Sequence, residues 1–204
     1  MAGQSKTLAE LGLTAMSGRQ VQVTGLAVDS RAVREGMLFA ALPGGRAHGA
    51  AFIETALAQG ARAVLTDPEG ARLAQGALAD SDAALVVAED PRQTLAFAAA
   101  LWSGAQPDTA IAVTGTNGKT SVASFTRQIW ERLGYDAVNL GTTGVEGAVS
   151  APMTHTTPEP ITLHRLLAYC AEEGVTHAAM EASSHGLDQR RLDGIRLQAA
   201  GFTN

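Results

Sequence analysis

Short apolar runs alternate with longer amphipathic runs along the first half of the chain. Four of the short runs have the length and branched residues of buried strands: Val21–Val28, Met37–Leu42, Ala63–Thr66 and Ala84–Ala88. Phe52–Gly60 and Arg92–Trp102 have the spacing of helices, and the second follows Asp90-Pro91, a proline at a first-turn position. The alternation predicts a small α/β domain.

A polar break at Ser103–Asp108 predicts a domain boundary. Beyond it the pattern predicts strands at Thr109–Thr114, Asp136–Leu140, His177–Glu181 and Ala199–Thr203, with helices at Lys119–Leu133 and Ile161–Glu173. Such strand–helix–strand units favour a parallel sheet with right-handed crossovers. We therefore expect an α/β fold with domains at 1–104 and 105–204. Because the chain stops at Asn204 directly after an apolar run, we expect the second sheet to be incomplete.

Composition narrows the class of protein. Hydrophobic residues make up 46% and aromatic residues 4%, so the core must be built from Ala, Val, Leu and Ile. A net charge of −5 without a basic cluster argues against a nucleic-acid partner. The single cysteine, Cys170, excludes an internal disulfide, and no apolar run has the length of a signal peptide or a membrane span. We expect a cytoplasmic protein that does not interact with membranes.

The strongest local signal is Ala112-Val-Thr-Gly115-Thr-Asn-Gly118-Lys119-Thr120-Ser121, in which a strand runs through a glycine turn into a helix. Glycines let backbone N–H groups approach phosphate oxygens, and the helix N-terminus adds partial positive charge. Lys119 supplies a full charge, and the Thr120 hydroxyl can bind Mg²⁺. The loop is a short variant, because Val113 stands where the usual pattern has a glycine. A plain glycine turn with a solvated lysine is the alternative.

Magnesium needs a second protein ligand, and Glu181 ends the apolar strand His177–Glu181. A carboxylate in that position lies beside phosphates bound at a neighbouring strand end. The alternative is an ordinary surface glutamate. We predict that Gly115, Thr116, Asn117, Gly118, Lys119, Thr120 and Ser121 bind ATP, that Thr120 and Glu181 bind Mg²⁺, and that Lys119 and Glu181 act in catalysis.

At this point the residues resemble a known family. The segment Thr114–Ser121 looks like the ATP loop of the Mur ligases, which folylpolyglutamate synthetases share. Met180-Glu-Ala-Ser-Ser-His-Gly-Leu187 and Thr156-Thr157-Pro158 are similar to motifs of the branch that makes the UDP-MurNAc-tripeptide. Asp29-Ser30-Arg31 resembles that branch's uridine-binding region. The resemblance covers about Val21 to Asn204.

The resemblance implies a UDP-sugar-binding domain followed by part of the central ATPase domain, with the C-terminal ligase domain absent. It implies an ATP-dependent ligase that adds the third amino acid, meso-diaminopimelate or lysine, to UDP-MurNAc-L-Ala-D-Glu through an acyl phosphate. The partners would be these small molecules, and the protein a monomer. By resemblance Ser30 contacts uridine, and Arg46 contacts the nucleotide-sugar in a loop whose match is looser. The remaining implied substrate contacts are Thr156, Thr157, Ser183, Gln189 and Arg191.

Other readings remain open. One is a different Mur-type or polyglutamate-type ligase, although a folate enzyme has no use for the Asp29–Arg31 motif. A second is a non-catalytic nucleotide-binding module, and we also expect this part of the protein to be inactive alone. A Ser183–His185 catalytic triad is rejected, since neighbouring side chains on a strand point to opposite faces. We expect most of the remaining histidines to lie in loops or on the surface: His48, His155, His164 and His177.

Overall fold

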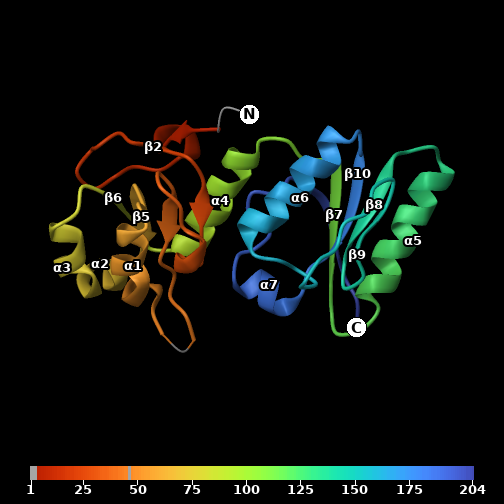
Figure 1. Ribbon diagram of the computed structural model, residues 1–204. Helices are drawn as coiled ribbons and strands as arrows, with labels where there is room; N and C mark the ends of the chain where they lie inside the picture. The colour runs from red at the N-terminus through yellow and green to blue at the C-terminus, as the bar shows by residue number, and fades with distance from the viewer. Residues whose placement is uncertain (1–3, 46) are drawn as a thin grey trace. The chain divides into compact units, whose positions relative to one another are not determined.

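The computed structural model describes residues 4–45 and 47–204 and divides the chain into two units, Met1–Trp102 and Ser103–Asn204 (Figure 1). Each unit contains its own parallel sheet, so the predicted α/β class is confirmed. Among the described residues no helix is both long and apolar enough to cross a membrane.

The first unit is built on a four-stranded parallel sheet with the order β3-β4-β5-β6. These strands are β3 (Leu26–Ala27), β4 (Leu38–Ala40), β5 (Ala63–Thr66) and β6 (Ala84–Val87). The helices are α1 (Ile53–Ala58), α2 (Pro68–Leu73), α3 (Gln75–Ala79) and α4 (Pro91–Ser103), with 3-10 turns η1 (Ala9–Leu11), η2 (Ser30–Ala32) and η3 (Gly49–Phe52). A core of buried Phe39, Ile53, Val64 and several alanines lies between α1 and the sheet.

Two expectations for this unit are wrong in detail, and two helices were missed. The run Val21–Val28 forms two strands in different sheets, because β2 (Gln22–Val23) pairs antiparallel with β1 (Lys6–Thr7) while β3 pairs with β4. Between them Thr24 turns away to donate its hydroxyl to Glu35 O at 2.9 Å. The helix predicted from Phe52 begins as η3 three residues earlier, capped by His48. Helices α2 and α3 were not predicted.

The second unit has a five-stranded sheet with the order β11-β7-β10-β8-β9. Its strands are β7 (Thr109–Thr114), β8 (Ala137–Gly141), β9 (Gly144–Gly147), β10 (His177–Glu181) and β11 (Leu197–Phe202). Parallel pairing holds for β11, β7, β10 and β8, whereas β9 turns back antiparallel against β8, an exception to the predicted pairing.

Helices α5 (Lys119–Arg132) and α6 (Pro160–Glu172) lie on opposite sides of this sheet (Figure 1). Leu163, Leu167 and Cys170 of α6 pack on buried strand residues such as Leu140 and Met180. The buried cluster consists mainly of Ala, Val and Leu, as the scarcity of aromatics predicted. The short helix α7 (Ser184–Asp188) follows β10. It corrects the assumption that Ser183 to His185 continue a strand.

Candidate functional site

The predicted phosphate loop connects β7 directly to α5. Gly115 has φ 133° and Gly118 φ 86°, a region of backbone conformation that side-chain-bearing residues rarely adopt. A Cβ added at Gly115 would lie 2.2 Å from Thr203 Oγ1 and 2.4 Å from Thr203 O. The Asn204 carbonyl accepts the N–H groups of Thr116 (2.7 Å) and Asn117 (3.2 Å). The end of β11 therefore holds the loop in shape from outside.

The N-terminus of α5 is open to an anion. No side chain among the described residues caps it, and the first N–H groups of any helix lack intrahelical acceptors. The Lys119 ammonium folds back to donate to Gly115 O at 2.7 Å and Thr116 O at 3.2 Å. Thr120 and Ser121 lie exposed in the first turn. This combination of open N–H groups, helix dipole and ammonium has the chemistry of a phosphate site.

Glu181 is a buried carboxylate, 3% exposed, at the carboxyl end of β10. It is paired in register with Val113, two residues before Gly115, so it lies at the same edge of the sheet as the phosphate loop. Its Oε1 accepts Thr142 N–H at 2.9 Å, and its Oε2 accepts the Thr142 hydroxyl at 3.4 Å. The absence of a side chain at Gly141 makes room for it, because a Cβ there would lie 1.9 Å from Oε1.

The surroundings of Glu181 fit a magnesium ion that is shared with phosphates. No group of three His, Cys, Asp or Glu residues suited to a metal is found in residues 4–45 and 47–204. Mg²⁺ commonly takes only one or two protein ligands and completes its shell with phosphate and water oxygens. A single carboxylate with unused lone pairs, beside a phosphate loop, matches that donor set.

The residues assigned by resemblance to the dipeptide form one hydrogen-bonded network around Glu181. The Thr157 hydroxyl donates to Glu181 O and accepts Ser183 N–H, both at 3.0 Å. Thr156 Oγ1 lies 3.1 Å from Thr142 Oγ1. Segments 26 residues apart in the sequence are therefore joined at one edge of the sheet.

Helix α7 extends this network. The Ser183 side chain caps α7 by accepting Gly186 N–H at 3.0 Å. The Arg191 guanidinium donates to Thr157 O at 2.6 Å and to Gln189 Oε1 at 2.7 and 3.2 Å. The guanidinium is thus held by a backbone carbonyl and a side-chain amide oxygen.

His164 is an exception to the expectation that most of the histidines lie in loops or on the surface. It is 2% exposed on α6, and its Nε2 lies 3.0 Å from Asp193 O, in the segment that follows Arg191. Burial lowers the pKa of His164, while the bond to Asp193 opposes that shift. The ring helps to fix the segment that carries Arg191.

Ser30 lies in the first unit, in η2 after β3, and is 7% exposed. It lines a cavity of about 670 Å³ at the carboxyl ends of β3 and β4. The cavity is also lined by Phe39, Ala47, Gly49 and Phe52. Parallel sheets bind ligands outside this edge. Arg46, also assigned to the nucleotide-sugar, lies outside the described residues.

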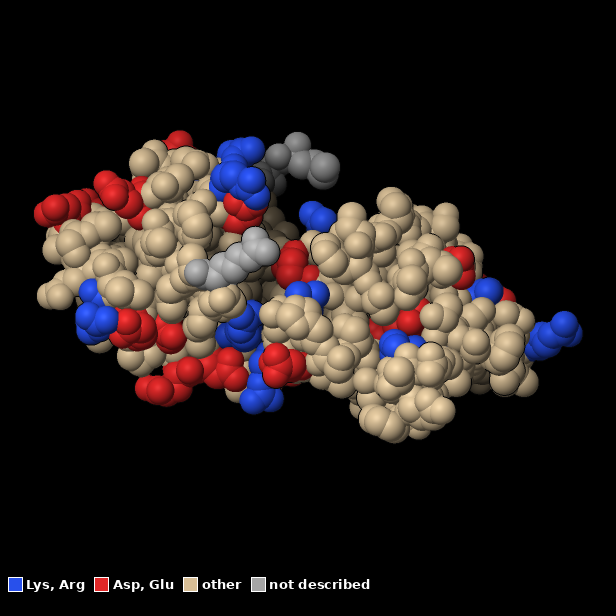
Figure 2. Space-filling model, turned by 90° about the horizontal axis from the view of Figure 1, so that it is seen from below, with Lys and Arg blue, Asp and Glu red and all other residues tan. Residues whose placement is uncertain are grey.

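Asp29 and Arg31 flank Ser30 and pair with each other. Arg31 Nη2 lies 2.7 Å from Asp29 Oδ2. The side-chain hydrogen bond from Arg31, followed by its backbone N–H bond, lowers the pKa of Asp29. On the face seen in Figure 2, acidic and basic side chains are interspersed rather than gathered by sign.

Comparison with known proteins gives matches in both units. Residues 22–103 match the model described as Mur ligase family, catalytic domain, and residues 113–204 match the Mur ligase middle domain. The UDP-N-acetylmuramoyl-L-alanyl-D-glutamate–2,6-diaminopimelate ligase of Brucella melitensis biotype 1 is 54% identical over 186 residues, covering 91% of this chain. The Rhizobium meliloti protein of that name is 53% identical over 188 residues, covering 90%.

A solved structure carrying the same ligase name superposes with a TM-score of 0.80 at 31% identity. That match covers 98% of this chain and 40% of the solved one. The chain spans about 37% of the length of the two curated relatives.

Proposed function

Because the chain belongs to the Mur ligase family, we propose that it forms the front part of an ATP-dependent ligase that adds meso-diaminopimelate to UDP-MurNAc-L-Ala-D-Glu in peptidoglycan synthesis. The observation that supports this most directly is the joining of Glu181, Thr157, Ser183 and Arg191 beside a phosphate loop. That arrangement holds two anionic groups, a nucleotide phosphate and a substrate carboxylate, at one sheet edge.

The proposed roles follow from the position of each side chain. Residues 115–121 hold the phosphates of ATP, with Lys119 leaving Gly115 O and Thr116 O to face the transferring phosphoryl group. Thr120 and Glu181 hold Mg²⁺, which when bound neutralises charge that develops on the phosphate oxygens. Arg191 clamps a carboxylate of the dipeptide, framed by Thr156, Thr157, Ser183 and Gln189.

The reaction that these groups serve has two steps. The D-Glu carboxylate attacks the γ-phosphorus of ATP, and the bond to the ADP oxygen breaks to give an acyl phosphate and ADP. The amine of diaminopimelate then attacks the acyl carbon and expels phosphate. Catalysis of this kind consists mainly of positioning and charge stabilisation, which are what the site residues offer.

The first unit is proposed to hold the uridine end of the substrate, with Ser30 in the cavity wall and Arg46 beside the nucleotide-sugar. We place the boundary between the two functional domains at residues 104 and 105. The protein is proposed to work in the cytoplasm, where ATP and the UDP-sugar are found, and as a monomer.

The test is phosphate release from ATP by the full-length protein. The enzyme is given UDP-MurNAc-L-Ala-D-Glu together with meso-diaminopimelate, lysine or no amino acid. We expect release only with the dipeptide substrate and diaminopimelate, together with a tripeptide product by mass spectrometry. Release with lysine instead would change the assigned amino acid, and no release from a protein that binds ATP would refute the ligase.

A further inference from the structure

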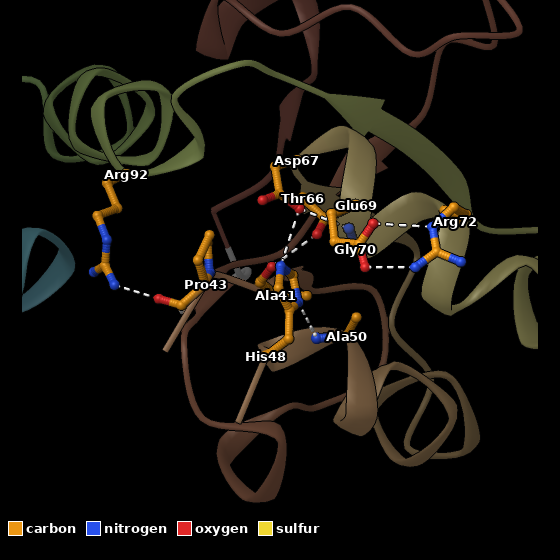
Figure 3. A network of polar contacts seen from close by, with 10 residues as sticks. All are labelled: Ala41, Pro43, His48, Ala50, Thr66, Asp67, Glu69, Gly70, Arg72 and Arg92. Atoms are coloured by element: carbon orange, nitrogen blue, oxygen red, sulfur yellow. Dashed lines mark hydrogen bonds and ion pairs between the residues drawn. The ribbon is translucent and has the colours of Figure 1, made fainter. Parts of the chain in front are cut away.

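One polar network in the first unit was not anticipated from the sequence (Figure 3). It ties the connection between β4 and η3 to the start of α2. The His48 ring lies between these segments, with Nε2 3.0 Å from Asp67 Oδ1 and Nδ1 3.0 Å from Ala50 N. Both side chains are largely covered, at 17% and 18% exposure.

The hydrogen bonds assign a role to each ring nitrogen. Ala50 N–H donates to Nδ1, so Nδ1 carries no proton and the ring hydrogen sits on Nε2, directed at Asp67. The same Asp67 oxygen accepts Gly70 N–H at 2.7 Å and so caps α2. His48 in turn caps η3. Two helix starts are thereby joined through one His–Asp contact.

Two glycines are required by this arrangement. A Cβ at Gly70 would lie 2.6 Å from His48 Cε1, 2.9 Å from Asp67 Oδ1 and 2.0 Å from Thr66 Oγ1. A Cβ at Gly49 would lie 2.7 Å from Leu42 N and 2.8 Å from Leu42 O. The chain can close this tightly only because both positions lack a side chain.

Further contacts fix the other end of the same connection. Thr66, at the end of β5, donates its hydroxyl to Ala41 O at 2.8 Å in a buried bond. Arg92, in the first turn of α4, donates to Pro43 O (Figure 3). Side chains from β5, from the start of α2 and from α4 therefore hold the connection between β4 and η3. Ordinary surface loops are more mobile than the elements they connect.

The residues on each side of His48 form part of the cavity wall. Ala47 and Gly49 line the cavity together with Ser30. We propose that His48 and Asp67 form a clasp that holds this wall in the shape that receives the nucleotide end of the substrate. Both are positioning residues, and the identity of the ligand rests on the proposed function.

The test uses variants of the full-length enzyme that remove the two hydrogen bonds of the His48 ring one at a time. His48→Asn keeps an acceptor near the Nδ1 position but cannot reach Asp67, whereas His48→Gln keeps a donor near Nε2 and loses the η3 cap. Gly70→Ala pushes the pair apart sterically. Glu69→Gln is the matched control, because Glu69 is exposed on the same helix and bonds Arg72 instead.

We expect each of the three clasp variants to raise the Kd for UDP-MurNAc-L-Ala-D-Glu, measured by calorimetry, about tenfold, the order expected when one hydrogen bond is lost. The KM for ATP, measured on the same preparation, should not change and also confirms folding. The Glu69→Gln enzyme should match the wild type.

Three results distinguish a failure of the proposed function from a failure of the proposed clasp. A wild-type enzyme that binds ATP but not the UDP-sugar overturns the proposed function, and the clasp's role falls with it. Wild-type binding with unchanged Kd in His48→Asn and His48→Gln overturns the clasp alone. Nitrogen NMR of the wild type should find the proton on Nε2 of His48, and a proton on Nδ1 would contradict the arrangement independently of any ligand.

Discussion

Because Gly141 lies so close to Glu181, we expect Gly141→Ala to reduce both stability and activity. The added Cβ would lie 1.9 Å from Oε1, 2.5 Å from Cδ and 2.7 Å from Cγ of Glu181, well inside contact distance. Gly141 is not among the positive-φ glycines of the described residues, so the backbone itself tolerates alanine. The whole effect must therefore come from the carboxylate, which has to move.

The magnitude follows from what the carboxylate loses. Moving it breaks the 2.9 Å bond from Thr142 N–H, a charged hydrogen bond whose loss costs about 1.5–3 kcal/mol. Residual overpacking adds about 1–3 kcal/mol, but part of it is relieved by the same movement. We expect the free energy of unfolding to fall by about 2–4 kcal/mol, and Mg²⁺-dependent phosphate release to be lost.

The stability assay is urea unfolding followed by Trp130 fluorescence. Trp102 is the other tryptophan of residues 1–204, so a Trp102→Phe background leaves Trp130, in the second unit, as the reporter within this part of the protein. The matched control is Gly201→Ala in β11 of the same unit, where an added Cβ meets nothing within 4 Å. There alanine should be neutral or stabilise by up to about 1 kcal/mol, the ordinary cost of glycine within a strand.

A double-mutant cycle tests whether the clash with Glu181 causes the loss of stability. In a Glu181→Ala background the same Gly141→Ala change should cost about 1 kcal/mol or less, because the clashing group is gone. If Gly141→Ala costs as much there as in the wild type, the clash with Glu181 is not the reason and our account of how the carboxylate is held is refuted.

Three further predictions concern the rest of the second unit. Lys119→Ala should reduce phosphate release at least about a hundredfold with unchanged urea unfolding, since Lys119 bonds only a partly exposed loop; equal activity would refute its role. Because burial lowers the folded-state pKa of His164, the unfolded chain binds the extra proton as pH falls below about 6.5, so stability should drop there. In His164→Gln that drop should shrink, and an unchanged pH profile would contradict it. Arg191→Lys should raise the KM for UDP-MurNAc-L-Ala-D-Glu about tenfold or more without raising that for ATP, because lysine cannot bridge Thr157 O and Gln189.

The sequence predicts an element correctly where the residues of that element alone determine its structure. The strand Thr109–Thr114 was predicted with the bounds it has, and the helix start at Lys119 was confirmed. Both follow from an apolar β-branched run, a glycine turn and a regular helical pattern. The fold class followed from the same alternation.

Other features depend on segments that the sequence does not place together. The bond from Ser183 N–H to Thr157 Oγ1 joins positions 26 residues apart, and no local pattern indicates it. Strand β9 was missed because it is short and carries Gly144 and Gly147 at φ 107° and 129°. Helix α7 had a readable signal, since Ser183 is a good N-cap residue, but the motif was treated as strand.

The contacts of Lys119 with Gly115 O and Thr116 O have a thermodynamic consequence. On the proposed function, a nucleotide that binds this loop meets an ammonium that is already bonded to the protein and not a solvated one. Binding is therefore an exchange, in which two carbonyl partners are released as phosphate oxygens take their place. The heat released on nucleotide binding will understate the strength of the final contacts, while the loop, already ordered, loses little entropy in making them.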